Sequence, residues 1–92
     1  MLIEFDASKN EKNVAARGLS FERVAEFDFS RAVIEVDDRK RYPETRYVAV
    51  GFLGQRLHIL CFTPINGGIR VISFRKANQR EIKAYEQARA TD

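Results

Sequence analysis

The sequence predicts an α+β fold in which helices pack on a small antiparallel sheet. Apolar and polar residues alternate through much of the stretch from Val33 to Arg75, short turn sequences interrupt it, and helix-capping signals lie on both sides. Strands joined by tight turns pair antiparallel, and the flanking helices must bury their apolar sides on the sheet. The expected order is β-α-α-β-β-β-β-α, with two N-terminal helices and one C-terminal helix. A length of 92 residues suits a single domain over residues 1–92.

The chain starts with the signature of a strand followed by a helix. Ile3 and Phe5 alternate with polar neighbours, which predicts a short strand. Residues 8–11 (Ser-Lys-Asn-Glu) have the spacing of a capping box, so the first helix is expected to begin there and to run to about Arg17. Gly18 can adopt the left-handed conformation that ends a helix.

Two more helices are predicted, one on each side of the strand region. Ser20 is expected to cap the second helix, and residues 78–81 (Asn-Gln-Arg-Glu) have capping-box spacing for the last one. Each has an apolar stripe at helical spacing, formed by Phe21, Val24 and Ala25 in the second helix and by Ile82, Tyr85 and Ala88 in the last.

Four strands are expected between these helices. A charged loop over 37–44 and turns at 54–55 and 66–68 separate them, and Asn66-Gly67-Gly68 is the strongest hairpin signal. The predicted strands are 33–36, 46–53, 56–63 and 69–75.

The net charge of +3 is unevenly distributed. Residues 1–38 carry five basic and nine acidic side chains, a sum of −4, whereas residues 39–92 carry eleven basic and four acidic ones, a sum of +7. A basic, arginine-rich surface attracts polyanions, although it can also be a solvated surface that keeps a protein in solution.

Residue counts exclude several classes of protein. One cysteine cannot form an internal disulfide, and with one histidine it cannot complete a four-ligand zinc site. The acidic N-terminus does not resemble a signal peptide, and no apolar run approaches the roughly 18 residues of a membrane span. We therefore expect a reduced, cytoplasmic location without membrane contact.

The end of the last strand is the first candidate site. Arg75 and Lys76 stand where the chain leaves the sheet, and Arg80 falls in the first turn of the last helix. A helix N-terminus prefers negative charge, so these three cations and the helix end could bind one phosphate. Alternatively, Arg80 pairs with Glu81, Glu44 or another surface carboxylate.

Several other residues could belong to a functional site, but each also has a purely structural interpretation. Glu44 and Arg46 form either a surface ion pair or a base and a charge-stabilising group. Arg56 faces either the same groove or solvent, and His58 lies mid-strand, where a packed residue is the more common case. Tyr85 is expected in the core, although its hydroxyl could reach the groove, and Cys61 is expected to be inert core.

An ordered set of residues along nearly the whole chain carries a family resemblance. Its densest part is residues 69–77 (Ile-Arg-Val-Ile-Ser-Phe-Arg-Lys-Ala), followed by Arg80-Glu81 and Tyr85. The earlier parts are Phe5-Asp6, Lys9, Asn13, Gly18–Glu22, Asp38-Arg39, Glu44–Arg46, Gly51 and Arg56. In this pattern the chain resembles the BrnT-type toxins, ribonucleases of bacterial type II toxin–antitoxin pairs with a RelE-like fold. Two positions depart from it: Ala16-Arg17 replaces a Lys-His pair, and Pro64 replaces an arginine.

The resemblance implies a metal-independent endoribonuclease that needs no cofactor and arrests growth. Its partners would be RNA and a cognate antitoxin, which is a small DNA-binding repressor. The toxin would form a hetero-oligomer with this antitoxin and would contact DNA only through it. We expect Arg75, Arg80 and Arg46 to act on the scissile phosphate and Glu44 to act as the base, because arginine is a poor base. Lys76, Arg56 and Arg70 are expected to bind RNA. The acid is unassigned, with Lys76 and Tyr85 as options.

A second interpretation belongs to a different class of protein. Because Ala16-Arg17 departs from the family pattern, the chain could be a catalytically weak or inactive module of the same fold that binds RNA or a partner. Intact RNA at high protein concentration, with tight and salt-sensitive binding, would favour this alternative.

Overall fold

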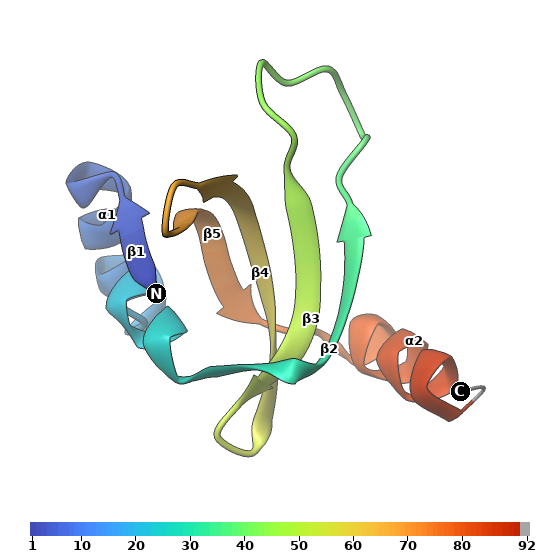
Figure 1. Cartoon of the computed structure of the whole chain (residues 1–92). Helices are drawn as coiled ribbons and strands as arrows, with labels where there is room; N and C mark the ends of the chain where they lie inside the picture. Colours follow the sequence, from blue (N-terminus) through green and yellow to red (C-terminus); the bar gives the residue numbers. More distant parts are fainter. Residues whose placement is uncertain (91–92) are drawn as a thin grey trace.

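The computed structural model describes residues 1–90 and confirms an α+β fold (Figure 1). No helix within these residues is long and apolar enough to cross a membrane. Along the chain the elements are β1 (Leu2–Phe5), α1 (Ala7–Arg17), the 3-10 helix η1 (Phe21–Glu26), β2 (Phe27–Val36), β3 (Tyr47–Leu53), β4 (Arg56–Ile65), β5 (Gly68–Lys76) and α2 (Gln79–Ala90).

The sheet has the strand order β1-β5-β4-β3-β2. Strands β2 to β5 pair antiparallel, as predicted, but β1 pairs parallel with β5, so the expectation of a purely antiparallel sheet was wrong. Parallel pairing is possible because α1 and the following elements carry the chain away from β1 before β5 returns beside it. Gly68 allows the close approach, since a Cβ atom there would collide with the Leu2 backbone.

Helix α1 begins earlier than the sequence analysis predicted. Its N-cap is Asp6, whose carboxylate accepts a hydrogen bond of 3.0 Å from the Lys9 backbone N–H, so the capping box at residues 8–11 was wrong. Asp6 lies three residues before the N–H it caps, and Ser8 is already inside the helix. The predicted end is confirmed, because Gly18 has a φ of 65° and donates to the Val14 carbonyl oxygen.

The second helix is a 3-10 helix rather than an α-helix. Ser20 caps it as expected, accepting from the Glu22 N–H at 3.1 Å. Three residues per turn place Phe21, Val24 and Phe27 on one side, and all three are buried, whereas Ala25 is exposed. The predicted stripe through Ala25 therefore failed because it assumed the α-helical period.

Strand β2 is longer than predicted, starting at Phe27 instead of Val33. Its pairing with β3 is irregular between Asp28 and Val33, which removes the simple alternation that marks a strand in a sequence. The other boundaries differ by one or two residues from the predicted ones.

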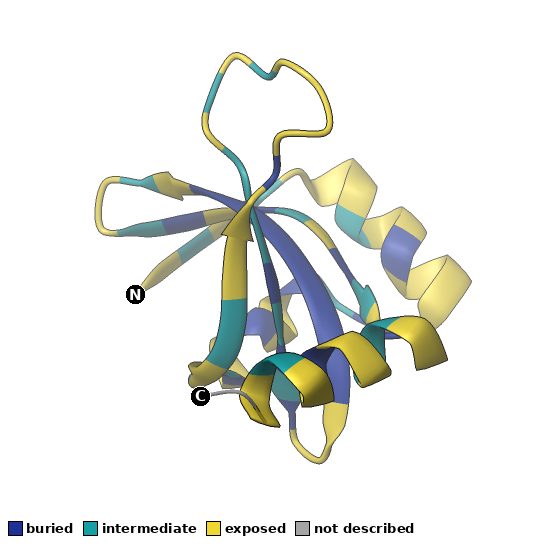
Figure 2. Cartoon of the chain, turned by 90° about the vertical axis from the view of Figure 1, so that its right-hand side faces the viewer, coloured by how far each residue is buried: buried dark blue, intermediate teal, exposed yellow. Residues whose placement is uncertain are grey.

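The helices cover the two faces of the sheet unequally. Helix α1 and η1 lie on one side and α2 on the other (Figure 1). The larger core cluster, on the α1 side, contains Leu19, Phe21, Val24, Phe27, Ala49, Leu53, Leu60, Phe62, Ile69, Val71 and Phe74. The smaller one, under α2, contains Leu57, Ile59, Ala77 and Tyr85. Figure 2 shows α2 beside the C-terminus with most of its surface exposed.

Candidate functional site

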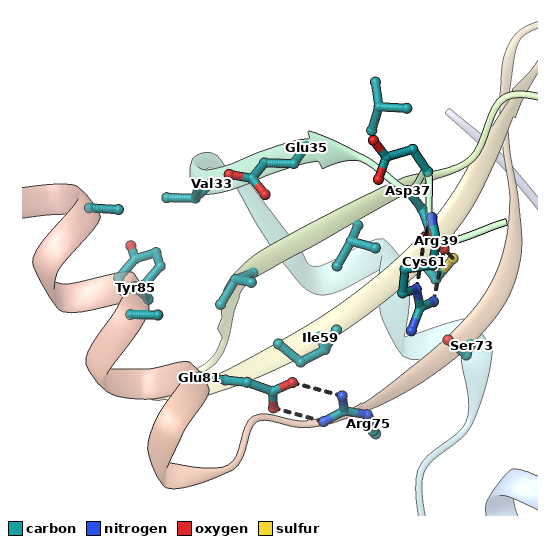
Figure 3. A pocket seen from close by; sticks show the side chains of 16 residues that line it. Val33, Glu35, Asp37, Arg39, Ile59, Cys61, Ser73, Arg75, Glu81 and Tyr85 are labelled. Atoms are coloured by element: carbon teal, nitrogen blue, oxygen red, sulfur yellow. Dashed lines mark hydrogen bonds and ion pairs between the residues drawn. The ribbon is translucent and has the colours of Figure 1, made fainter.

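An open groove of about 500 Å³ lies on the α2 face of the sheet. We call it the α2 groove. Apolar side chains of β3 and β4 form much of its floor, and α2 and the chain after β2 form its sides (Figure 3). Its lining residues are Val33, Glu35, Val36, Asp37, Asp38, Arg39, Val48, Val50, Ile59, Cys61, Ser73, Arg75, Glu81, Ala84, Tyr85 and Ala88.

Both arginines of the α2 groove are held by carboxylates (Figure 3). Arg39 donates to both oxygens of Asp37 at 2.8 and 2.9 Å, and Arg75 donates to both oxygens of Glu81 at 2.9 and 2.8 Å. The Arg39 guanidinium lowers the pKa of Asp37 to about 2, and the hydrogen bonds from Arg75 lower the pKa of Glu81. With Glu35 and Asp38 the groove is lined by four carboxylates and two arginines, so its net charge is −2.

The start of α2 carries the predicted capping box. Asn78 Oδ1 accepts from the Glu81 N–H, and Glu81 Oε1 accepts from the Asn78 N–H, both at 2.9 Å. Glu81 therefore places a carboxylate at the helix N-terminus and binds Arg75 there, where the sequence analysis expected an external anion. Arg80 is exposed and forms no ion pair with the described residues, although its charge helps to lower the pKa of Glu81.

A second hollow, of about 300 Å³, lies where α1 and β5 end. We call it the cationic hollow, because its lining residues are Arg17, Leu19, Arg75 and Lys76. Arg17 is held by a 2.8 Å hydrogen bond to the Asn13 side chain. Asn13 is itself buried and donates to the carbonyl oxygens of Leu19 and Phe74, at 2.9 and 3.0 Å. This network fixes a guanidinium of α1 beside the cations of β5.

Two residues of β4 lie at the same end of the sheet. Arg56 donates to the Ala77 carbonyl oxygen at 2.9 Å and so ties β4 to the segment between β5 and α2. His58 stands opposite Lys76 in the register of β4 and β5. We call this part of the molecule the basic end; its cations are Arg17, Arg56, Arg75, Lys76 and Arg80.

The remaining predicted site residues lie at the opposite end of the sheet. Arg70 precedes Arg75 by five strand residues, or about 16 Å, and it binds Glu4 of β1. Arg46 donates to Glu44 at 3.1 Å and lies 4.0 Å from the centre of the Tyr42 ring. Ile59 of β4 pairs with Arg75 on one side and with Val50 of β3 on the other. Arg46 precedes Val50 by four residues, about 13 Å along the strand direction, and β3 is two strands away from β5.

Tyr85 and Cys61, both expected in the core, are buried. The Tyr85 hydroxyl donates to the Arg31 carbonyl oxygen at 2.8 Å, and its ring packs edge-on against Phe52. Cys61 is buried, and burial raises the pKa of its thiol. Within residues 1–90, no group of three or more His, Cys, Asp or Glu side chains could hold a metal ion.

Sequence reasoning did not name Arg17 or Arg39 as site residues. Arg17 was noted only as a departure from the family pattern, although its spacing of four from Asn13 was a signal that the two side chains share a helix face. Arg39 had a comparable signal, because Asp37 stands two residues before it. Neither spacing says which surface the guanidinium reaches, because that depends on β5 and α2.

A fixed cluster of cations at one end of a small α+β protein is suited to binding a polyanion. Residues 5–81 match the family model described as the ribonuclease toxin BrnT of a type II toxin–antitoxin system. The chain therefore belongs to the BrnT family of ribonuclease toxins, and the family implies an RNA target and an antitoxin partner. No curated protein and no solved structure matches the chain.

Proposed function

We propose that this protein is a metal-independent endoribonuclease that binds the scissile phosphate of RNA at the basic end. The observation that supports the proposal is the cationic hollow, where Arg17, Arg75 and Lys76 line one space and no carboxylate of residues 1–90 lines it. The α2 groove is larger, but its net charge of −2 repels a phosphate backbone. Charge therefore favours the smaller hollow over the larger groove.

The cations of the basic end supply what phosphodiester cleavage needs most. As the 2′-oxygen attacks phosphorus, negative charge grows on the phosphoryl oxygens, and fixed guanidinium groups stabilise that charge. Arg75 is held by Glu81 and Arg17 by Asn13, so neither side chain must be ordered when RNA binds. Lys76 and Arg80, both exposed, provide further contacts to the backbone.

Our assignment separates the sequence candidates into two groups. Arg75, Arg80, Lys76 and Arg56 belong to the proposed site because they share the basic end. Glu44, Arg46 and Arg70 lie at the opposite end of the sheet, where Glu44 is paired with Arg46 and Arg70 with Glu4. A carboxylate at that distance cannot take a proton from a 2′-hydroxyl held beside Arg75.

The partner and location form part of the same proposal. We infer a small DNA-binding antitoxin that occludes the toxin in a hetero-oligomer and brings it to DNA. A cytoplasmic location follows, because the RNA target is there. A RelE-like fold is supported by the antiparallel core of the sheet and by α1 and η1 on one face.

Induced expression and a purified-protein assay test the function together. We expect induction to stop growth, and we expect the protein to cleave labelled RNA in excess EDTA, leaving 2′,3′-cyclic phosphate and 5′-hydroxyl ends. Arg75→Ala and Arg80→Ala should relieve the arrest while the protein remains folded. Arg70→Ala is the matched control, an arginine of the same strand β5 outside the basic end, and it should stay toxic. Tight binding of RNA that stays intact would establish the binding-module alternative instead.

A further inference from the structure

The basic end has cations for a phosphate but lacks an evident proton acceptor. The carboxylate that contacts Arg75, that of Glu81, already binds this arginine with both oxygens and caps α2. Arginine and lysine are protonated at neutral pH and cannot accept the proton of a 2′-hydroxyl. His58 is a titratable side chain beside these cations, and it stands opposite Lys76 on the neighbouring strand.

The structure fixes the orientation of the His58 ring. The ring is buried on the α1 side of β4, with its centre 5.3 Å from that of the Phe74 ring. Its Nδ1 lies 2.9 Å from the Arg56 carbonyl oxygen. A carbonyl oxygen can only accept, so Nδ1 carries the hydrogen in this contact and Nε2 of the neutral ring holds the free lone pair.

The free lone pair of His58 has limited contact with solvent. Every solvent-inaccessible side-chain nitrogen or oxygen of the described residues has a hydrogen-bond partner. Among these residues the hydrogen bond of the ring is made by Nδ1. Nε2 is therefore not fully enclosed, although only 3% of the residue as a whole is exposed.

The surroundings of His58 keep the ring neutral. Burial lowers its pKa below the usual value of 6.5, and positive charges on three elements act in the same direction: Arg56 on β4, Lys76 on β5 and Arg23 on η1. The contact of Nδ1 with the Arg56 carbonyl opposes this effect. A neutral imidazole at pH 7 is able to accept a proton.

We propose that Nε2 of His58 is the general base of RNA cleavage at the basic end, an inference that rests on the proposed ribonuclease function. The 2′-hydroxyl proton passes to Nε2 while the 2′-oxygen forms a bond to phosphorus. The bond from phosphorus to the 5′-oxygen breaks, and this oxygen takes a proton from the Lys76 ammonium group. The products are a 2′,3′-cyclic phosphate and a 5′-hydroxyl, and solvent returns His58 and Lys76 to their starting protonation states.

Single-turnover cleavage of a labelled RNA across pH tests the role of His58. The wild-type rate constant should rise with pH through a limb below pH 6.5 and then level off. His58→Leu retains an apolar side chain against Phe74, and we expect it to bind RNA with unchanged Kd but to cleave at least about 100-fold more slowly without that limb. His58→Gly leaves room for a ring. Added imidazole should raise the rate constant of this variant at least about tenfold, because a general base contributes about 100-fold or more.

The controls separate this inference from the function on which it rests. Wild-type protein that leaves RNA intact would overturn the ribonuclease proposal and, with it, the role of His58. Wild-type cleavage together with a folded His58→Leu variant that cleaves within threefold of it, with the same pH profile, would overturn the inference about His58 alone. If His58→Leu unfolds, imidazole rescue of His58→Gly decides: rescue supports the general base, and a folded but unrescued variant contradicts it.

Discussion

The described residues on the α1 face of the sheet include a cluster of eleven buried apolar side chains, whereas the cluster on the α2 face has four. The two faces also differ in charge. The groove on the α2 face is lined by four carboxylates and two arginines, and the hollow where α1 ends is lined by three cations and a leucine. The α1 face therefore has the larger apolar cluster and the hollow lined by cations, whereas the α2 face has the smaller cluster and the acidic groove.

This difference shows that the volume of a hollow is a poor guide to the ligand of a polyanion-binding protein. The α2 groove is the larger space because α2 contributes few apolar side chains to that face of the sheet. The cationic hollow is small because Asn13 and Leu19 pack closely against β5. Asn13 fixes Arg17 on the well-packed face and Glu81 of α2 fixes Arg75, which suits a site that must stabilise charge without reordering.

A matched pair of substitutions tests the difference in packing and has the largest expected effect. Phe74→Ala removes a fully buried ring from the α1 face and should lower the free energy of unfolding by about 3–5 kcal/mol. Phe52→Ala removes a half-buried ring from the α2 face and should lower it by roughly half as much. Urea unfolding followed by circular dichroism measures both, and equal losses would contradict the proposed inequality.

Removal of cations from each face tests the difference in charge. Arg17→Ala combined with Lys76→Ala should weaken RNA binding at least about tenfold and reduce the slope of log K against log salt by about 0.7 for each cation removed. Arg39→Ala removes an exposed cation from the α2 groove and should change neither quantity appreciably. Fluorescence anisotropy over a salt series measures the slopes, and a larger effect of Arg39→Ala would place RNA in the groove.

A smaller effect is expected where α2 meets the sheet. Tyr85→Phe removes the hydrogen bond to the Arg31 carbonyl oxygen and should lower the free energy of unfolding by about 1 kcal/mol. Because the hydroxyl is already bound to the backbone, RNA cleavage should continue at the wild-type rate. Loss of cleavage in a folded Tyr85→Phe protein would instead identify this hydroxyl as the acid.

The smallest effect concerns pH and the Arg75–Glu81 pair. The pKa of Glu81 is lowered from its ordinary value of 4.5, so the pair stabilises the fold above about pH 4.5 and loses this contribution as pH falls through the lowered pKa. Glu81→Gln keeps the capping box and removes the charge, and should lower stability by about 0.5 kcal/mol at pH 7. The Tm difference between wild type and variant, measured from pH 7 to pH 2, should shrink; a constant difference would contradict the role of charge.

Local signals predicted those parts of the fold that depend on neighbouring residues. The capping box of Asn78 and Glu81 lies within one turn of chain, and the sequence revealed it directly. The conformation of η1 was not predicted, because Phe21, Val24 and Ala25 have α-helical spacing, whereas the residues that are buried are Phe21, Val24 and Phe27, with 3-10 spacing. The parallel partner of β1 was not predicted either, since no local pattern reports a contact with a strand 66 residues later.

In the candidate site, too, the sequence predicted the proximity of residues that are close along the chain but not of those that come from distant elements. Arg75, Lys76 and Arg80 lie within six residues of one another, so the sequence suggested their proximity. Arg17 and His58 reach the same place from α1 and β4, and their approach depends on packing that a single sequence does not reveal. Glu44 and Arg46 were grouped with Arg75 by chemical role, and the sheet register separates them.

The pairing of β1 with β5 has a consequence for the synthesis of this protein. Strand β1 is translated before the other strands of the sheet, and its partner residues Gly68–Val71 follow 66 residues later. Until then Leu2–Phe5 has no strand beside it, and the largest apolar cluster lacks Ile69, Val71 and Phe74. Closure of such a distant contact is slow compared with local folding, so the nascent chain has no complete sheet until β5 has emerged. A ribosome-bound chain therefore cannot complete its cationic hollow before β5, which carries Arg75 and Lys76, has been translated.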